Sequence, residues 1–240
     1  MIKRILLLFL PLFTYAQNSY QVIYEARQEF DRSKLESPKQ DVLVILNNSE
    51  SKTYEYELIV NKTNSYFKKV DKIDNSQKNG GISFGISSEA GANIFKDLNE
   101  GFFYEEDMMT NKLFIKDSLI KFQWEITDET KDILGYKVKK AIYVNPNQTV
   151  EAWFAPELSF RDGPTKFSGL PGLILEVKFK IPFVSDLDTK IIYKAIAIKE
   201  YKGKIELPKN SKIVAKEVRQ KELKENQKRY STIQSGVERD

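Results

Sequence analysis

The stretch FSGLPGLILEVKFK, residues 167–180, joins a turn to a strand and indicates the class of fold. From Leu173 every second residue is apolar, and from Glu176 the residues between them are charged. A period of two puts successive side chains on opposite faces, which is typical of a strand with one buried and one solvated face. Just before it, Pro171-Gly172 fits the centre of a type II turn in which Gly172 has a positive φ. The stretch therefore predicts a tight turn that leads into a half-buried strand.

Similar strand patterns recur along most of the chain. They are clearest at Tyr20–Phe30 and Ile120–Ile126, where apolar and polar residues alternate. Shorter β-rich segments are Tyr54–Val60, Ser65–Val70, Phe102–Glu105, Lys112–Lys116, Tyr136–Val144, Val150–Ala155 and Lys190–Ile198. Half-solvated strands that follow one another closely favour an antiparallel meander over a parallel sheet. We therefore expect a mainly β protein with a single large antiparallel curved sheet or a partly open barrel.

Two segments depart from this pattern. Asp71–Asn99 is polar and contains four glycines, so we expect a long glycine-rich loop there. Lys212–Arg229 is dense in lysine and glutamate, which favours a charged surface helix that frays toward the end of the chain. The expected organisation is a β-rich domain over residues 17–211, followed by a charged C-terminal tail over residues 212–240.

The first sixteen residues have the pattern of a secretory signal peptide. Two basic residues, Lys3 and Arg4, precede the apolar run Ile5–Phe13, and Ala16 offers a small residue for cleavage before Gln17. The run is shorter than the roughly 20 residues that span a bilayer. We therefore expect an exported protein, located in the periplasm, at the outer membrane or outside the cell, with no transmembrane segment in the mature chain.

The composition excludes several kinds of chemistry. The chain contains no cysteine and no histidine, so thiol nucleophiles, Ser-His-Asp triads and the usual structural zinc sites are excluded. Removing residues 1–16 lowers the formal charge from +4 to +2, and a nearly neutral chain gives no reason to expect a nucleic-acid partner. We expect no catalytic residue of these classes, no bound metal and no cofactor.

A motif in the second half of the chain resembles a known family. It consists of Trp153, Phe154, Gly163, Pro164, Phe167, Gly169, Leu170, Pro171, Gly172, Leu173 and Ile174. This pattern is similar to the signature of the GLPGLI family, secreted proteins of the Bacteroidota for which the resemblance implies no established activity. Many members carry a cysteine where this chain has Val138. We interpret the motif first as turns and packing, with a ligand or partner loop as the alternative.

Three hypotheses about function follow. The first, which we favour, is a non-enzymatic binding or envelope-assembly protein with an apolar or peptidic ligand. The second is a glycosidase-like hydrolase that uses two carboxylates. Its candidate acids are Glu151, Glu157, Asp162 and Glu176. The third is an interaction subunit of an outer-membrane complex. Because solvated acids are far commoner than catalytic pairs, we expect Glu151→Gln and Asp162→Asn to leave folding almost unchanged.

Overall fold

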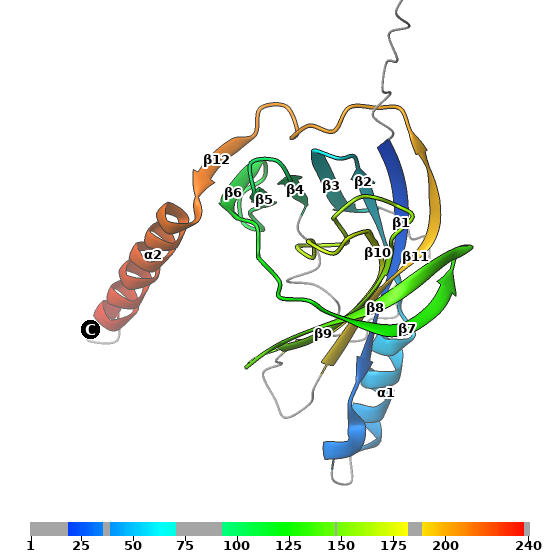
Figure 1. Ribbon diagram of the computed structural model, residues 1–240. Helices are drawn as coiled ribbons and strands as arrows, with labels where there is room; N and C mark the ends of the chain where they lie inside the picture. The colour runs from blue at the N-terminus through cyan, green and yellow to red at the C-terminus, as the bar shows by residue number, and fades with distance from the viewer. Residues whose placement is uncertain (1–18, 36–38, 71–92, 147, 182–188, 238–240) are drawn as a thin grey trace, which may run out of the picture.

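The computed structural model describes residues 19–35, 39–70, 93–146, 148–181 and 189–237 (Figure 1). The predicted signal peptide lies outside the described residues, as does most of the predicted glycine-rich loop. In the part of the chain that the structure describes, no helix is long and apolar enough to cross a membrane.

The protein is built on one twelve-stranded sheet, in the order β12-β6-β5-β4-β3-β2-β1-β11-β10-β9-β8-β7. In chain order its strands are β1 (Ser19–Phe30), β2 (Tyr54–Val60), β3 (Asn64–Lys69), β4 (Ile94–Asp97), β5 (Phe102–Glu106), β6 (Leu113–Ser118), β7 (Glu125–Ile133), β8 (Tyr136–Asn145), β9 (Gln148–Ala155), β10 (Leu173–Ile181), β11 (Thr189–Tyr201) and β12 (Lys212–Ala215). All neighbours are antiparallel except β12 and β6, which are parallel. The predicted fold class, a mainly β protein with one large curved sheet that does not close, is confirmed.

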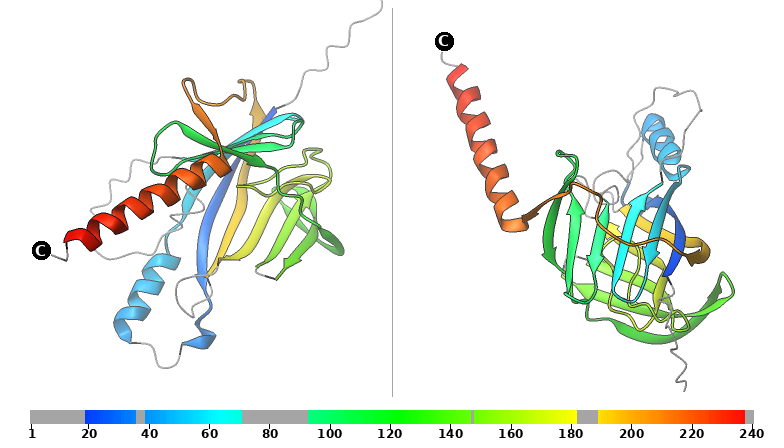
Figure 2. Two further views of the ribbon diagram at one scale, coloured as in Figure 1. Left: turned by 90° about the vertical axis from the view of Figure 1, so that its left-hand side faces the viewer. Right: turned by 90° about the horizontal axis from the view of Figure 1, so that it is seen from above.

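The two helices that the structure describes lie near different strands of the sheet. Helix α1 (Gln40–Glu50) lies beside β1, and a short 3-10 turn (Arg32–Lys34) precedes it. Helix α2 (Lys216–Val237) projects away from the sheet, as both views of Figure 2 show. The charged C-terminal helix expected from the sequence is therefore present, although it begins at Lys216. Residues Lys212–Ala215, expected within that helix, form β12 instead.

The sheet curves so that its two halves enclose the segment 156–172, which connects β9 to β10 (Figure 1). Contacts from this segment reach strands of both halves. Phe160 packs against Tyr20 of β1, with ring centroids 5.4 Å apart. Lys166 Nζ lies 2.8 Å from Glu105 Oε2 of β5. Residues 156–172, called here the motif segment, therefore occupy the concave side of the sheet.

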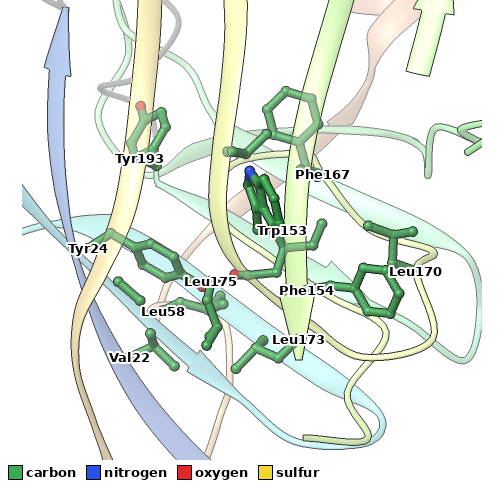
Figure 3. Packing of buried hydrophobic residues seen from close by; sticks show 14 of the residues in the cluster. Val22, Tyr24, Leu58, Trp153, Phe154, Phe167, Leu170, Leu173, Leu175 and Tyr193 are labelled. Atoms are coloured by element: carbon green, nitrogen blue, oxygen red, sulfur yellow. Dashed lines mark hydrogen bonds between the residues drawn. The ribbon is translucent and has the colours of Figure 1, made fainter. Parts of the chain in front are cut away.

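The core lies between that segment and the inner face of the sheet, and it is rich in aromatic residues (Figure 3). The predicted alternation is observed in β10, where Leu173, Leu175, Val177 and Phe179 are all buried. In the centre, Phe67 stacks on Tyr56 with ring centroids 5.2 Å apart. Burial of such large apolar side chains is the main source of stability that this cysteine-free protein has available.

The prediction of a strand at Ile120–Ile126 is wrong for most of that segment. Residues 119–124 have no regular structure, and β7 begins only at Glu125. The aromatic side chains of this segment pack on the motif segment as well as on Tyr143 of β8, outside any strand pairing. Phe122 lies 5.4 Å from Phe167 between ring centroids, and Trp124 Nε1 donates to Ser168 O at 2.9 Å.

Two further segments differ from the sequence-based expectation. The predicted loop Asp71–Asn99 contains strand β4 (Ile94–Asp97), which is paired on both sides, with β3 and with β5. Helix α1 was not predicted. It is held to the end of β1 by Glu50, whose Oε1 accepts from the Phe30 amide at 2.8 Å.

Candidate functional site

The motif segment is shaped by two glycines for different reasons. The prediction of a positive φ at Gly172 is wrong, because the motif glycine with a positive φ is Gly169, at 96°. Gly172 is needed for space, since a Cβ there would lie 2.3 Å from the carbonyl oxygen of Ala155. Its amide donates to Leu170 O at 2.9 Å and closes the tight turn around Pro171. The stretch LPGL is therefore a turn, but a turn whose backbone lies directly on the end of β9.

Most of the motif side chains face the core. Phe154, Leu170, Leu173 and Ile174 are almost completely buried, whereas Gly169 and Pro171 are exposed. Gly163 lies against Ile174, where an added Cβ would be 2.7 Å from that residue's own Cβ. These positions fit the interpretation of the motif as turns and packing. Its role as a ligand or partner loop stays a prediction.

A buried ion pair lies beneath the motif segment. Lys96 of β4 and Asp162 have no exposed side-chain surface, and Lys96 Nζ lies 2.5 Å from Asp162 Oδ1. The expectation that Asp162 is a solvated acid is therefore wrong. Burial lowers the pKa of Lys96, and the charge of Asp162 partly offsets this shift. Burial also raises the pKa of Tyr24 well above its ordinary value, and the charge of Asp162 raises it further.

Next to this segment lies a pocket of about 270 Å³, called here the aromatic pocket. It is lined by Ile120, Phe122, Tyr143, Asn145, Gln148, Thr165, Lys166, Phe167 and Phe179. Its four aromatic rings form a connected group. The ring centroid of Phe122 lies 5.1 Å from that of Tyr143, and the centroid of Phe167 lies 5.0 Å from that of Phe179. Three distant parts of the sequence therefore meet there: the segment before β7, the motif segment, and the adjoining strands β8, β9 and β10.

The polar residues of the pocket are held by defined contacts. Asn145 Nδ2 donates to the hydroxyl oxygen of Tyr143 at 3.1 Å, and Gln148 Nε2 donates to Lys180 O at 3.2 Å. Lys166 is paired with Glu105, so the only charged side chain among the described residues of the lining is neutralised by a carboxylate. The pocket thus combines apolar ring faces with amide and hydroxyl groups, a combination typical of small-molecule sites.

The four acids proposed for a hydrolase do not form a common site. Asp162 is buried in the ion pair described above, and Glu157 is exposed on the motif segment. Glu151 and Glu176 lie on the outer face of the sheet on either side of Trp153, where each pairs with a lysine. The Lys140–Glu151 distance is 3.3 Å, and the Lys131–Glu176 distance is 2.8 Å.

The outer-face group has the character of a salt-bridge network around a tryptophan. Trp153 Nε1 donates to Glu151 Oε1 at 3.2 Å, and Lys131 Nζ lies 4.2 Å from the centre of its ring. Such pairs stabilise a strand surface modestly. Within the described ranges no cluster of three or more histidine, cysteine or acidic residues is placed to hold a metal ion.

Comparisons with known proteins found a sequence similarity over part of the chain and a similarity of fold. The profile of the family described as "N-glycanase peptide, N-terminal domain" matches residues 103–220, just under half of the chain. No curated protein matches in sequence. A solved structure of PNGF-II in space group C2 covers 83% of this chain at 19% identity, with a TM-score of 0.53. A second, in space group P21, covers 85% at 19% identity, with a TM-score of 0.55.

The likeness shows the fold. This chain covers 31% and 32% of those two structures, so it spans about a third of their length. The matched range 103–220 includes the motif segment and all the described residues that line the aromatic pocket.

Proposed function

We propose that this protein is a non-enzymatic binding protein, exported from the cell, that takes the ring of an uncharged carbohydrate in the aromatic pocket. The observation that carries the proposal is the pocket itself, with Phe122, Tyr143, Phe167 and Phe179 grouped beside side-chain amides. This replaces the apolar or peptidic ligand that we expected from the sequence.

The size of the pocket supports a single ring as the ligand. Its volume of about 270 Å³ lies just below the roughly 300–1,000 Å³ of pockets for drug-sized molecules. A sugar ring presents a face of C–H groups that stacks on an aromatic side chain. Its hydroxyl groups are hydrogen-bonded by amides and hydroxyls, such as those of Asn145, Gln148 and Thr165.

The charge of the lining supports a neutral ligand. In the part of the lining that the structure describes, Lys166 is the one ionic side chain, and Glu105 lies 2.8 Å from its ammonium group. An anionic ligand would have to compete with that carboxylate. A cationic ligand would meet the lysine. A neutral, hydroxyl-rich ligand avoids both costs.

The comparisons and the sequence add support from outside the pocket. The matching family profile is named for an N-glycanase, which favours a glycan-related ligand over a lipid. The pattern of residues 1–16 supports export. On the motif residues we also propose that the chain belongs to the GLPGLI family. Three of the four candidate acids are paired with lysines, Asp162 with Lys96, Glu151 with Lys140 and Glu176 with Lys131, which favours binding over hydrolysis.

The test is binding of glycopeptides measured by calorimetry. We expect the purified mature chain to bind an N-linked glycopeptide and not the same peptide without its glycan. Tyr143→Ala should weaken binding about three- to tenfold, because one aromatic contact contributes on the order of 0.5–1.5 kcal/mol. The matched control is Tyr104→Ala, which removes a tyrosine that packs on Phe95 away from the pocket and should leave affinity unchanged.

Two results would overturn the proposal. One is a wild-type protein that binds none of a panel of neutral glycans and glycopeptides. The other is a Tyr143→Ala variant that binds as tightly as wild type. Mass spectrometry of the recovered glycopeptide separates binding from hydrolysis, and a cleaved product would favour the hydrolase hypothesis instead.

A further inference from the structure

Lys96 is the only lysine among the described residues with no exposed side-chain surface, and its ammonium group has three acceptors. Nζ donates to Asp162 Oδ1 at 2.5 Å, to Gly163 O at 2.9 Å and to Phe167 O at 3.3 Å. An ammonium group has three protons to donate. The contacts therefore match its full hydrogen-bonding capacity in a place that water does not reach.

All three acceptors belong to the motif segment, whereas Lys96 comes from β4 in the opposite half of the sheet. Two other long-range contacts hold this turn, from Trp124 Nε1 to Ser168 O and from Lys166 to Glu105, and the remaining bonds are local. Gly169 N donates to Arg161 O at 3.0 Å, and Asp162 forms an isolated bridge with Ser168. The lysine thus draws the two ends of the turn, Asp162-Gly163 and Phe167, toward a single point.

The residues between those ends form one wall of the aromatic pocket. Thr165, Lys166 and Phe167 all line it, and the ring of Phe167 packs between Phe122 and Phe179. Phe167 therefore has two roles at once. Its carbonyl oxygen accepts from Lys96 inside the core, and its ring faces the pocket.

We propose that Lys96 and Asp162 are positioning residues for the aromatic pocket, which fix the backbone of residues 163–167 and so place the Phe167 ring. This inference rests on the proposed function for its ligand, although its geometric part can be tested without one. Neither residue reaches the pocket itself, so both act through Phe167.

The chemistry of the Lys96–Asp162 pair favours a role in positioning the motif segment over a role in stabilising the fold. Two polar atoms near the pair, Asp162 Oδ2 and Ser65 Oγ, are buried without a hydrogen-bond partner in the described structure. Ser65 lies opposite Lys96 in the β3–β4 ladder. Unpaired polar atoms cost stability. Buried ion pairs are often no more stable than apolar replacements of similar volume. What an apolar pair would lack is the directional bonds to Gly163 O and Phe167 O.

The experiment compares three proteins. The double variant Lys96→Met/Asp162→Asn removes both charges with little change of volume. The matched control Lys131→Met breaks the outer-face pair with Glu176. The measurements are thermal unfolding, amide hydrogen exchange at Phe167 and Gly169, and glycopeptide affinity. If Lys96→Met/Asp162→Asn does not fold, the apolar pair Lys96→Met/Asp162→Leu takes its place.

We expect the double variant to fold, to exchange the Phe167 and Gly169 amides at least tenfold faster than wild type, and to bind at least tenfold more weakly. Amides of β1 and β10 should exchange as before, which separates a local effect from general destabilisation. Lys131→Met should match wild type in every measurement.

The inference is overturned if a folded double variant keeps wild-type exchange at Phe167 and Gly169. It is also overturned if the wild-type amides of these residues exchange as fast as those of exposed turns, a result that needs no variant. If wild type binds no glycopeptide, the proposed function fails, and the exchange data alone decide the role of Lys96.

Discussion

Replacing Gly172 by alanine should destabilise the protein strongly, for a reason different from the one its sequence suggests. Its φ lies outside the left-handed region, so an alanine meets no backbone strain there. Its Cβ would, however, lie 2.3 Å from Ala155 O and 2.7 Å from Ala155 C. Because these atoms belong to the backbone at the end of β9, no side-chain rotation can relieve the contact.

The expected magnitude follows from this contact. Overpacking of a core typically costs about 1–3 kcal/mol and sometimes more, and a backbone neighbour places Gly172→Ala at the upper end, about 3 kcal/mol. For a chain of this size that corresponds to roughly 6–12 °C in melting temperature. Differential scanning calorimetry measures it directly.

The control is Gly135→Ala in the β7–β8 turn, where φ is 81° and no atom lies within 4 Å of an added Cβ. That variant carries the conformational cost of a positive φ, of order 1–2 kcal/mol, without a steric one. We expect Gly172→Ala to melt at the lower temperature. A Gly172→Ala protein that melts within 2 °C of wild type, a margin set by the roughly 2–4 °C that accompany 1 kcal/mol, would refute the reasoning.

Three further predictions concern the surface and the export of the protein. Burial raises the pKa of Asp107, but hydrogen bonds from the Arg219 guanidinium and a backbone amide outweigh it and lower the pKa below the ordinary 3.8. This contribution to the docking of α2 is therefore fully present above that value and is lost as the pH falls through the lowered pKa. Hydrogen exchange in the second turn of α2, relative to the intrinsic rate at each pH, should rise only below about pH 3.8. The variant Asp107→Asn should show fast exchange there at neutral pH as well. Glu151→Gln should change the unfolding free energy by no more than about 1 kcal/mol in a urea titration, because its partner Lys140 is a surface group. The exported protein should begin at or near Gln17, and an intact mass that includes residues 1–16 would contradict the signal-peptide assignment.

Strands of the sheet were predictable because their side chains alternate between a buried and a solvated face. In β10 and β1 apolar and polar residue types alternate with this period of two. The predicted ends of both strands lie within a residue or two of the observed ends. The same pattern gave a wrong prediction of a strand at Ile120–Ile126. There Phe122 and Trp124 are partly buried against the motif segment and Tyr143 of β8 without lying in a strand themselves, and alternation alone does not tell the two cases apart.

The candidate site was predictable only in part, because its pieces meet across long sequence separations. The motif residues were identified, and Phe167 does line the pocket. Lys96 and Asp162 are 66 residues apart, and Lys96 lies in a segment that its polar, glycine-rich surroundings assigned to a loop. The only local signal was the short apolar pair Ile94-Phe95 beside it. Tyr143 was placed on a strand, but nothing in its neighbourhood indicated which face would meet the motif.

The placement of residues 156–172 limits which ligands the proposed binding function could involve. An open curved sheet offers a concave face on which a large apolar ligand could lie, and that was the ligand favoured by the sequence. Here the segment covers that face with its own core residues and anchors itself there through a buried ammonium group. A ligand in the aromatic pocket therefore lies against the edge of the segment rather than inside the sheet. The turn chemistry of the motif and the pocket wall are consequently one structure, so a change that disturbs packing at Gly163 or Gly172 should also alter the pocket.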